Sequence, residues 1–203
     1  MKMRKWLMTA MLPVVAVAVS GCGSTKVGRV DSGKEIALTD RWNAEDSRQV
    51  SQEMIGDMMS FPWVQEFTRA NRGKRPTVIV QRIANKSHEH IATDTFVNDI
   101  KRAVIRSGKA DFVAGGAERE ALREEKKQQD VHASEKTRVE MGQESGANFA
   151  LSGSINSFVD QLDGKRVTFY QVDLKLINVE TTREVWNGQK KIQKLMERSR
   201  FGL

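Results

Sequence analysis

Three strand-like segments follow one another in the last third of the chain, and they constrain the fold more than any other feature. The segments cover residues 148–160, 165–180 and 183–195. β-Branched and aromatic residues are frequent in them, and Asp163-Gly164 is typical of a two-residue hairpin turn between the first two. Because the links are short, we expect an antiparallel meander. Other elements of the chain must then cover one face of this sheet.

A strand, a helix and a second strand are predicted in the middle of the chain. The sequence TVIVQRIAN at residues 77–85 is β-branched and apolar, and DFVAGG at residues 111–116 can form a second short strand. Between them, residues 93–108 have an apolar stripe at helical spacing, formed by Phe96, Ile100, Ala103 and Val104. Thr93 is predicted to be the N-cap of this helix, and Gly108 is suited to its end. A helical crossover of this length usually connects two parallel strands.

Further helices are predicted before and after this unit. From about Glu45, apolar residues recur every four positions, and Asn43 or Asp46 can cap the helix. Residues 60–70 suggest a short second helix, and the charged residues 117–146 suggest two more. The order of helices, a βαβ unit, more helices and three strands predicts an α+β fold. We expect a single domain in which helices pack on one mixed β-sheet.

The N-terminus has the three parts of a secretory signal peptide. A basic start is followed by an apolar run from Leu7 to Val19 and then by the small residues Ser20 and Gly21. The apolar run is 13 residues long, whereas a helix that spans a membrane needs about 20. We therefore expect residues 1–21 to be removed on export.

The only cysteine of the chain, Cys22, follows directly. The sequence Val19-Ser20-Gly21-Cys22 resembles the bacterial lipobox, whose cysteine is acylated and becomes the first residue of the mature protein. Because two or three acyl chains hold a protein lastingly, we expect Cys22 to anchor the chain in a membrane. An ordinary signal peptide with an incidental cysteine is the alternative. Gly23 stands where enterobacterial lipoproteins of the inner membrane have Asp, so the resemblance favours the periplasmic face of the outer membrane.

Residues 22–36 predict a short flexible tether, since they are rich in Gly, Ser and charged residues without apolar periodicity. The 13 residues from Gly23 to Glu35 span at most about 45 Å when fully extended. Residues 37–203 then form the globular domain. The whole chain has 33 Lys and Arg against 26 Asp and Glu. Removal of the basic signal peptide leaves a mature chain that is only mildly basic.

No catalytic arrangement is recognisable in the sequence. The chain lacks a GxSxG nucleophile motif and a glycine-rich phosphate loop, and an acylated Cys22 cannot be a nucleophile. His88-Glu89-His90 could offer ligands to zinc, but the third histidine, His132, lies in a charged helical stretch. A surface loop before the next helix is the simpler interpretation. We therefore expect no enzymatic activity, no metal and no cofactor.

Binding to another macromolecule is the function class that remains. Basic stretches at residues 69–75 and 187–200 could suit nucleic acid, but export removes access to it. Because loops on a rigid sheet often carry binding residues, we expect the partner to contact the loop from Asn85 to His90. The candidate contact residues are Arg82, Asn85, Lys86, His88 and His90. We expect the protein to be a monomer.

Sequence blocks over most of the mature chain are similar to those of a known family. The blocks are ALTDRWNAEDSRQVSQEMIGDMM, FPWVQEF, RPTVIVQRIANKSHEHIATDTFVNDIKRAVIRSGK, ALSGSINSFVD and TFYQVDLKLINVETTREVWNGQKKIQK. In order and spacing, from about Ala37 to Lys194, they resemble the outer-membrane lipoproteins that activate penicillin-binding proteins, the LpoB family. The resemblance implies a small α+β domain similar to the N-terminal domain of the periplasmic protein TolB.

The resemblance also implies a function that depends on contact with an enzyme. Such a domain binds a bifunctional penicillin-binding protein of the inner membrane and raises its peptidoglycan synthesis, without an active site of its own. A structural or adaptor lipoprotein of an envelope transport or secretion complex is the alternative. Enterobacterial members are similar in having a long linker rich in Pro and Gln, from which the short tether of this chain departs.

Overall fold

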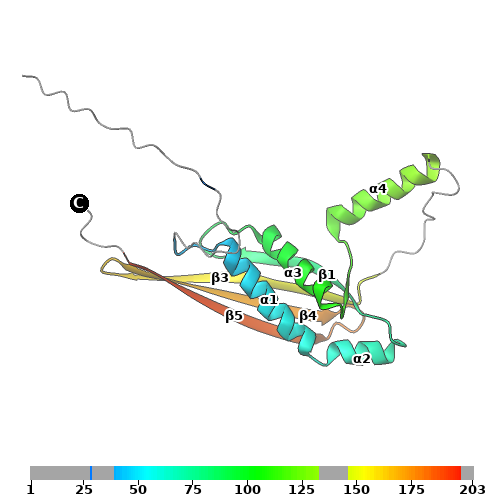
Figure 1. The fold of residues 1–203 in the computed structure, drawn as a ribbon, viewed down its shortest axis with the longest axis horizontal. Coiled ribbons are helices and arrows are strands. Elements are labelled where there is room, and N and C mark those ends of the chain that lie inside the picture. The colour runs from blue at the N-terminus through cyan, green and yellow to red at the C-terminus, as the bar shows by residue number, and fades with distance from the viewer. Residues whose placement is uncertain (1–27, 29–38, 133–145, 198–203) are drawn as a thin grey trace, which may run out of the picture. The chain divides into compact units, whose positions relative to one another are not determined.

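A computed structural model describes residues 28, 39–132 and 146–197 of the chain (Figure 1). The predicted signal peptide, Cys22 and nearly all of the predicted tether lie outside the described residues, as do residues 133–145 of the charged segment. No helix in the described part reaches the length and hydropathy that crossing a membrane requires.

One mixed sheet of five strands, in the order β2-β1-β3-β4-β5, forms the centre of the domain. β1 (Thr77–Lys86) pairs in parallel with both β2 (Asp111–Phe112) and β3 (Phe149–Leu162). β4 (Lys165–Asn178) pairs antiparallel with β3 and with β5 (Glu184–Glu197). The predicted parallel βαβ unit and the predicted antiparallel meander are both confirmed, and with them the α+β fold.

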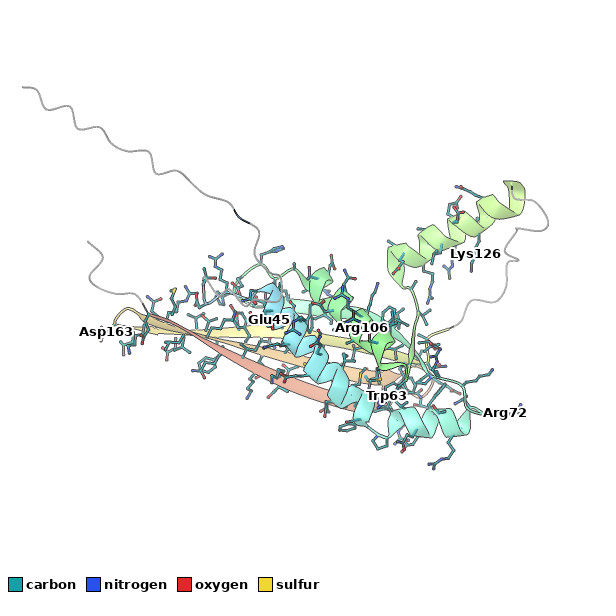
Figure 2. All side chains as sticks on the ribbon, viewed as in Figure 1. Glu45, Trp63, Arg72, Arg106, Lys126 and Asp163 are labelled. Carbon is teal, nitrogen blue, oxygen red and sulfur yellow. The ribbon has the colours of Figure 1, made fainter. Side chains whose placement is uncertain are left out.

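The turn between β3 and β4 has the geometry that its sequence predicts. Asp163 and Gly164 both have positive φ, at 48° and 81°. Two successive positive φ angles match a type I′ turn, whose twist suits a two-residue hairpin. Asp163 therefore lies at the tip of a long hairpin (Figure 2).

Four helices accompany the sheet, and the first begins as predicted. They are α1 (Ala44–Ser60), α2 (Trp63–Ala70), α3 (Thr93–Ser107) and α4 (Gly116–His132). Asn43 caps α1, because its side chain accepts a hydrogen bond of 2.9 Å from the backbone N–H of Asp46. The Asp46 carboxylate accepts one of 2.8 Å from the N–H of Asn43 in return, which completes a capping box.

The predicted N-cap of α3 is wrong by one residue, whereas its predicted end at Gly108 is confirmed. Ala92 is the N-cap and makes no side-chain hydrogen bond, so Thr93 is the first helical residue. The reason is a tight turn before the helix, in which the N–H of Thr93 donates to the carbonyl of Ile91 at 2.9 Å. Gly108 ends the helix in the left-handed conformation, with φ of 65°.

The helices α1 and α3 pack on one face of the sheet, which we call the helix face (Figure 1). Alternate residues of β4 point toward them and are buried: Thr168, Tyr170, Val172, Leu174 and Leu176. Each predicted apolar residue of the α3 stripe also joins this core, with Ala103 at its margin. The opposite face, which we call the open face, carries no packed helix in the described part of the chain.

Candidate functional site

The loop between β1 and α3 contains two of the five candidate contact residues, His88 and His90, and hydrogen bonds with Asn85 at the end of β1 fix its shape. The side-chain oxygen of Asn85, Oδ1, accepts a hydrogen bond of 2.9 Å from the backbone N–H of Ser87 and one of 2.6 Å from the Ser87 hydroxyl. The Asn85 amide group donates to the carbonyl of Glu89 at 2.8 Å. Asn85 is thus exposed but serves mainly to hold the loop.

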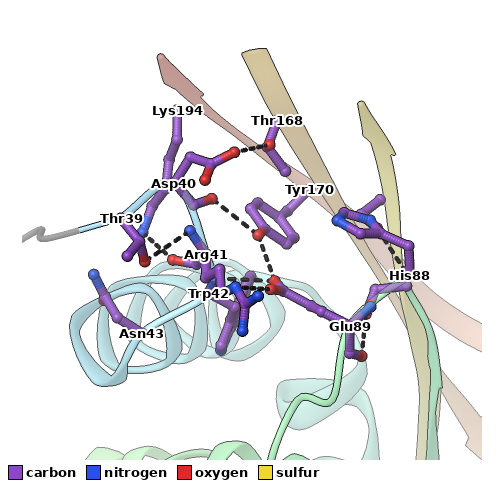
Figure 3. A network of polar contacts seen from close by, with 12 residues as sticks. Thr39, Asp40, Arg41, Trp42, Asn43, His88, Glu89, Thr168, Tyr170 and Lys194 are labelled. Atoms are coloured by element: carbon purple, nitrogen blue, oxygen red, sulfur yellow. Dashed lines mark hydrogen bonds and ion pairs between the residues drawn. The ribbon is translucent and has the colours of Figure 1, made fainter. Parts of the chain in front are cut away.

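Glu89 turns inward from this loop and joins three separate parts of the chain (Figure 3). One carboxylate oxygen accepts from the backbone N–H of Trp42 at 3.0 Å and from the hydroxyl of Tyr170. The same hydroxyl lies 3.0 Å from the carbonyl oxygen of Asp40. Burial, followed by the hydrogen bond to Glu89 and its negative charge, raises the pKa of Tyr170 well above its ordinary range. Tyr170 therefore stays a neutral donor at every physiological pH.

Asp40 is the second buried carboxylate of this region, with a relative exposure of 5%. It accepts a hydrogen bond from the Thr168 hydroxyl, and the Nε of Arg166 lies 3.0 Å from the same carboxylate oxygen. The Arg166 contact is an ion pair without hydrogen-bond alignment. Burial opposes ionisation of Asp40, but the Thr168 hydrogen bond and the Arg166 charge outweigh it and lower its pKa.

Together these groups hold the start of the domain against the sheet. We call the set of Asp40, Glu89, Arg166, Thr168 and Tyr170 the polar clamp (Figure 3). Lys194 of β5 adds to it by donating to the carbonyl of Arg41 at 2.9 Å and by pairing with the buried carboxylate of Asp46. Because its acids and bases are engaged with one another, the clamp is a structural element rather than a reactive centre.

The two candidate histidines lie outside the polar clamp. His88 is exposed, and its Nδ1 lies 2.6 Å from the Ser157 hydroxyl of β3. Its Nε2 lies 3.5 Å from a guanidinium nitrogen of Arg166. His90 is exposed as well. Among residues 39–132 and 146–197, no three His, Cys, Asp or Glu side chains are placed to hold a metal ion.

Arg82 and Lys86 lie on the open face, away from the clamp. Both are exposed residues of β1, and both line a depression of about 760 Å³ that extends across β1, β3, β4 and β5. The structure thus divides the candidate residues into two groups. Arg82 and Lys86 line the depression of the open face, whereas His88 and His90 lie in the loop above the clamp; Asn85, at the end of β1, lines the depression and also holds the loop.

An amide cluster on the open face, on strands β3 to β5, was not predicted from the sequence. Asp173 accepts hydrogen bonds from Gln171 at 3.0 Å, from Gln189 at 2.9 Å and, at a longer 3.4 Å, from Asn156. These residues come from three adjacent strands, and Asp173 faces Gln189 directly in the pairing of β4 with β5. Polar residues at alternate positions of a strand indicate a polar face of the sheet. They do not show which side chains of neighbouring strands form hydrogen bonds with one another.

Comparisons with known proteins identify relatives of this fold. A family model described as peptidoglycan-synthase activator LpoB matches residues 46–192. Among curated proteins, no relative gives a significant match. The LpoB C-terminal domain from Escherichia coli is similar in structure, with a TM-score of 0.45 and 15% identity over 73% of this chain and 99% of that chain.

Two further solved structures are similar to this chain. The LpoB C-terminal domain from Salmonella enterica has a TM-score of 0.41 and 17% identity, over 73% of this chain and 99% of that one. The lipoprotein GNA1162 from Neisseria meningitidis has a TM-score of 0.38 and 16% identity, over 62% of this chain and 87% of that one.

The match to the family model decides the family. It begins in α1 and ends in β5, so it includes, in whole or in part, every helix and strand of the described residues. Its residues, 46–192, make up well over half of the 203-residue chain. The chain therefore belongs to the LpoB family of peptidoglycan-synthase activators.

Proposed function

We propose that this protein is a lipoprotein that binds and activates a bifunctional penicillin-binding protein in the periplasm. The membership of the LpoB family carries the proposal. Cys22 would attach the mature chain to the outer membrane, and the domain would regulate the synthase by contact. A regulatory role agrees with the polar clamp, whose titratable groups hold the fold together instead of facing a substrate cleft.

The proposed contact surface is the loop above the clamp together with the adjacent edge of the open face. His88 and His90 are exposed on the loop, and Arg82 and Lys86 are exposed on β1 next to it. Because Asn85, Ser87 and Glu89 fix the backbone, the loop loses little conformational freedom when a partner binds. A preformed loop beside the exposed cations of β1 suits an acidic patch on a synthase.

The direct test measures polymerisation of lipid-linked precursor by each bifunctional synthase of the host. The mature protein in detergent is added to each purified synthase, and we expect at least one synthase to be stimulated. Lys86→Glu should weaken this stimulation. Lys74→Glu makes the same charge change at an exposed position after α2 and should leave stimulation unchanged.

Two outcomes would contradict the proposal. If no bifunctional synthase of the host responds, activation is not the function, and co-purification with transport or secretion subunits would support the adaptor alternative. If Lys74→Glu and Lys86→Glu behave alike, the contact surface lies elsewhere. A Cys22→Ser variant tests the anchor separately, since it should move the protein from the membrane fraction to the soluble periplasm.

A further inference from the structure

The open face has a depression of which the proposed synthase contact uses only the β1 edge, where Arg82 and Lys86 lie. The depression, of about 760 Å³, has the volume of an ordinary ligand site. Most of the residues that line the depression are polar or charged, and Asp173 and Gln189 of the amide cluster are among them, whereas the centre of a protein interface is usually apolar and depleted of charge. The composition of this surface therefore favours a polar ligand over a folded protein.

The hydrogen bonds of the amide cluster fix which atoms face outward. A carboxylate can only accept, so the NH₂ groups of Asn156, Gln171 and Gln189 must point toward Asp173. Their carbonyl oxygens consequently point away from it, and within the described part of the chain these oxygens have no hydrogen-bond partner. Three fixed acceptors are thus offered to ligand groups that donate, such as hydroxyls and amide N–H groups.

Hydroxyl groups in the depression lie on one side of these acceptors, and an aromatic pair lies beyond its lining on the other side. Ser152 and Ser154 provide hydroxyl groups on the floor of the depression. Phe158 and Phe169 lie opposite each other in the pairing of β3 with β4, two residues beyond Asn156 and Gln171 and on the same face. Their relative exposures are 65% and 38%, so both rings are accessible. Exposed aromatic faces beside hydrogen-bonding amides suit a sugar ring, which has an apolar C–H face and polar edges.

The charges around the depression narrow the class of ligand. Three cationic side chains, Arg82, Lys86 and Lys175, and two anionic ones, Asp173 and Glu184, line it. This near balance does not favour nucleic acid or an anionic lipid surface, which need a clear excess of positive charge. A neutral or weakly acidic polymer fits better.

We propose that the open face binds a glycan of N-acetylated sugars. The acetamido N–H and hydroxyl groups of the sugar donate to the amide oxygens, and Phe158 or Phe169 stacks on a ring. The inference does not depend on synthase activation, because it concerns only this protein and a saccharide. In the periplasm, such a contact would hold the domain on the cell-wall polymer itself.

The test titrates the mature protein in detergent with the tetramer of N-acetylglucosamine and follows binding by calorimetry. We expect saturable binding that Gln189→Ala and Phe158→Ala each weaken about tenfold. Gln161→Ala removes the same side chain from an exposed position of β3 that points to the other face, and it should bind as the unaltered protein does. Cellotetraose, which lacks acetamido groups, should bind about tenfold more weakly.

Several results would overturn the inference. They are no binding of the tetramer at millimolar concentration, equal binding of both saccharides, and equal loss in Gln161→Ala and Gln189→Ala. Circular dichroism of each variant excludes misfolding as the cause of lost binding. Synthase stimulation by Gln189→Ala should stay normal, which separates this inference from the proposed function.

Discussion

The polar clamp makes a quantitative prediction for Tyr170→Phe, which removes one hydroxyl group and keeps the ring. Tyr170 has a relative exposure of 1%, and its hydroxyl donates to the Glu89 carboxylate. A hydrogen bond to a charged group contributes about 1.5–3 kcal/mol, so we expect the free energy of unfolding at pH 7 to fall by that amount. Urea unfolding followed by circular dichroism measures it. Ser60→Ala, which removes an exposed hydroxyl, should change it by less than about 0.5 kcal/mol.

The same substitution should change the pH dependence of stability. The pKa of Tyr170 is raised in the folded state, so its contribution is complete below the unfolded pKa of about 10 and is lost as the pH rises above it. The stability difference between the unaltered protein and Tyr170→Phe should shrink by about 1.4 kcal/mol per pH unit in that range. Because the chain has one tyrosine, tyrosinate absorbance reports its ionisation directly.

Two results would refute the reasoning on the clamp. A Tyr170→Phe variant as stable as the unaltered protein would mean that the hydroxyl contributes nothing. Ionisation of Tyr170 near pH 10 in the folded protein would mean that the hydroxyl faces solvent. A double-mutant cycle with Glu89→Gln isolates the pair, and an interaction energy near zero would place the effect of Tyr170 elsewhere.

Three further predictions concern other parts of the fold. Asp40→Asn should destabilise the protein at pH 7, and this loss of stability should shrink as the pH falls below about 4. The lowered pKa of Asp40 makes its contribution complete above the unfolded pKa and lost as the pH falls through the folded pKa. Urea unfolding at pH 7 and pH 3 checks it. Gly153→Ala should lower the free energy of unfolding by about 1–3 kcal/mol, since a Cβ would stand 2.1 Å from the Asp173 carbonyl oxygen. By contrast, a Cβ at Gly56 in α1 meets nothing within 4 Å, so Gly56→Ala should raise the free energy of unfolding by up to about 1 kcal/mol. Trp186→Phe should cost roughly 1–2 kcal/mol through the lost 2.8 Å hydrogen bond to Asp57, measured by urea unfolding.

The elements that the sequence predicts are those set by neighbouring residues. Periodicity locates α1 and α3, because residues four apart share a helix face, and it locates β4 through its alternation. Turn chemistry locates the hairpin, because Asp163 and Gly164 tolerate positive φ. The N-cap of α3 was predicted one residue too late, because it depends on the tight turn at Ile91, which the spacing of apolar residues does not reveal.

The polar clamp and the amide cluster could not be predicted in the same way. The Asp40 carboxylate meets Thr168 across 128 residues of chain, and Glu89 meets Tyr170 across 81. Both contacts depend on the register of the sheet, which is decided by the packing of the whole core. The sequence shows Thr168 and Tyr170 alternating in a strand, but it does not show which distant acids they bind.

If Cys22 is acylated as proposed, the clamp also determines how far from the membrane anchor the domain can lie. Asp40 is fixed to β4, so the chain that separates anchor and domain extends from Cys22 to Asp40 rather than to Glu35. This stretch of 18 residues could span about 60 Å when fully extended. The clamp joins Asp40 to Glu89, so the proposed contact loop lies at the end of the domain that the tether enters. A synthase that binds this loop must therefore come close to the membrane in which an acylated Cys22 is held, because the contact surface stays near the end of the tether.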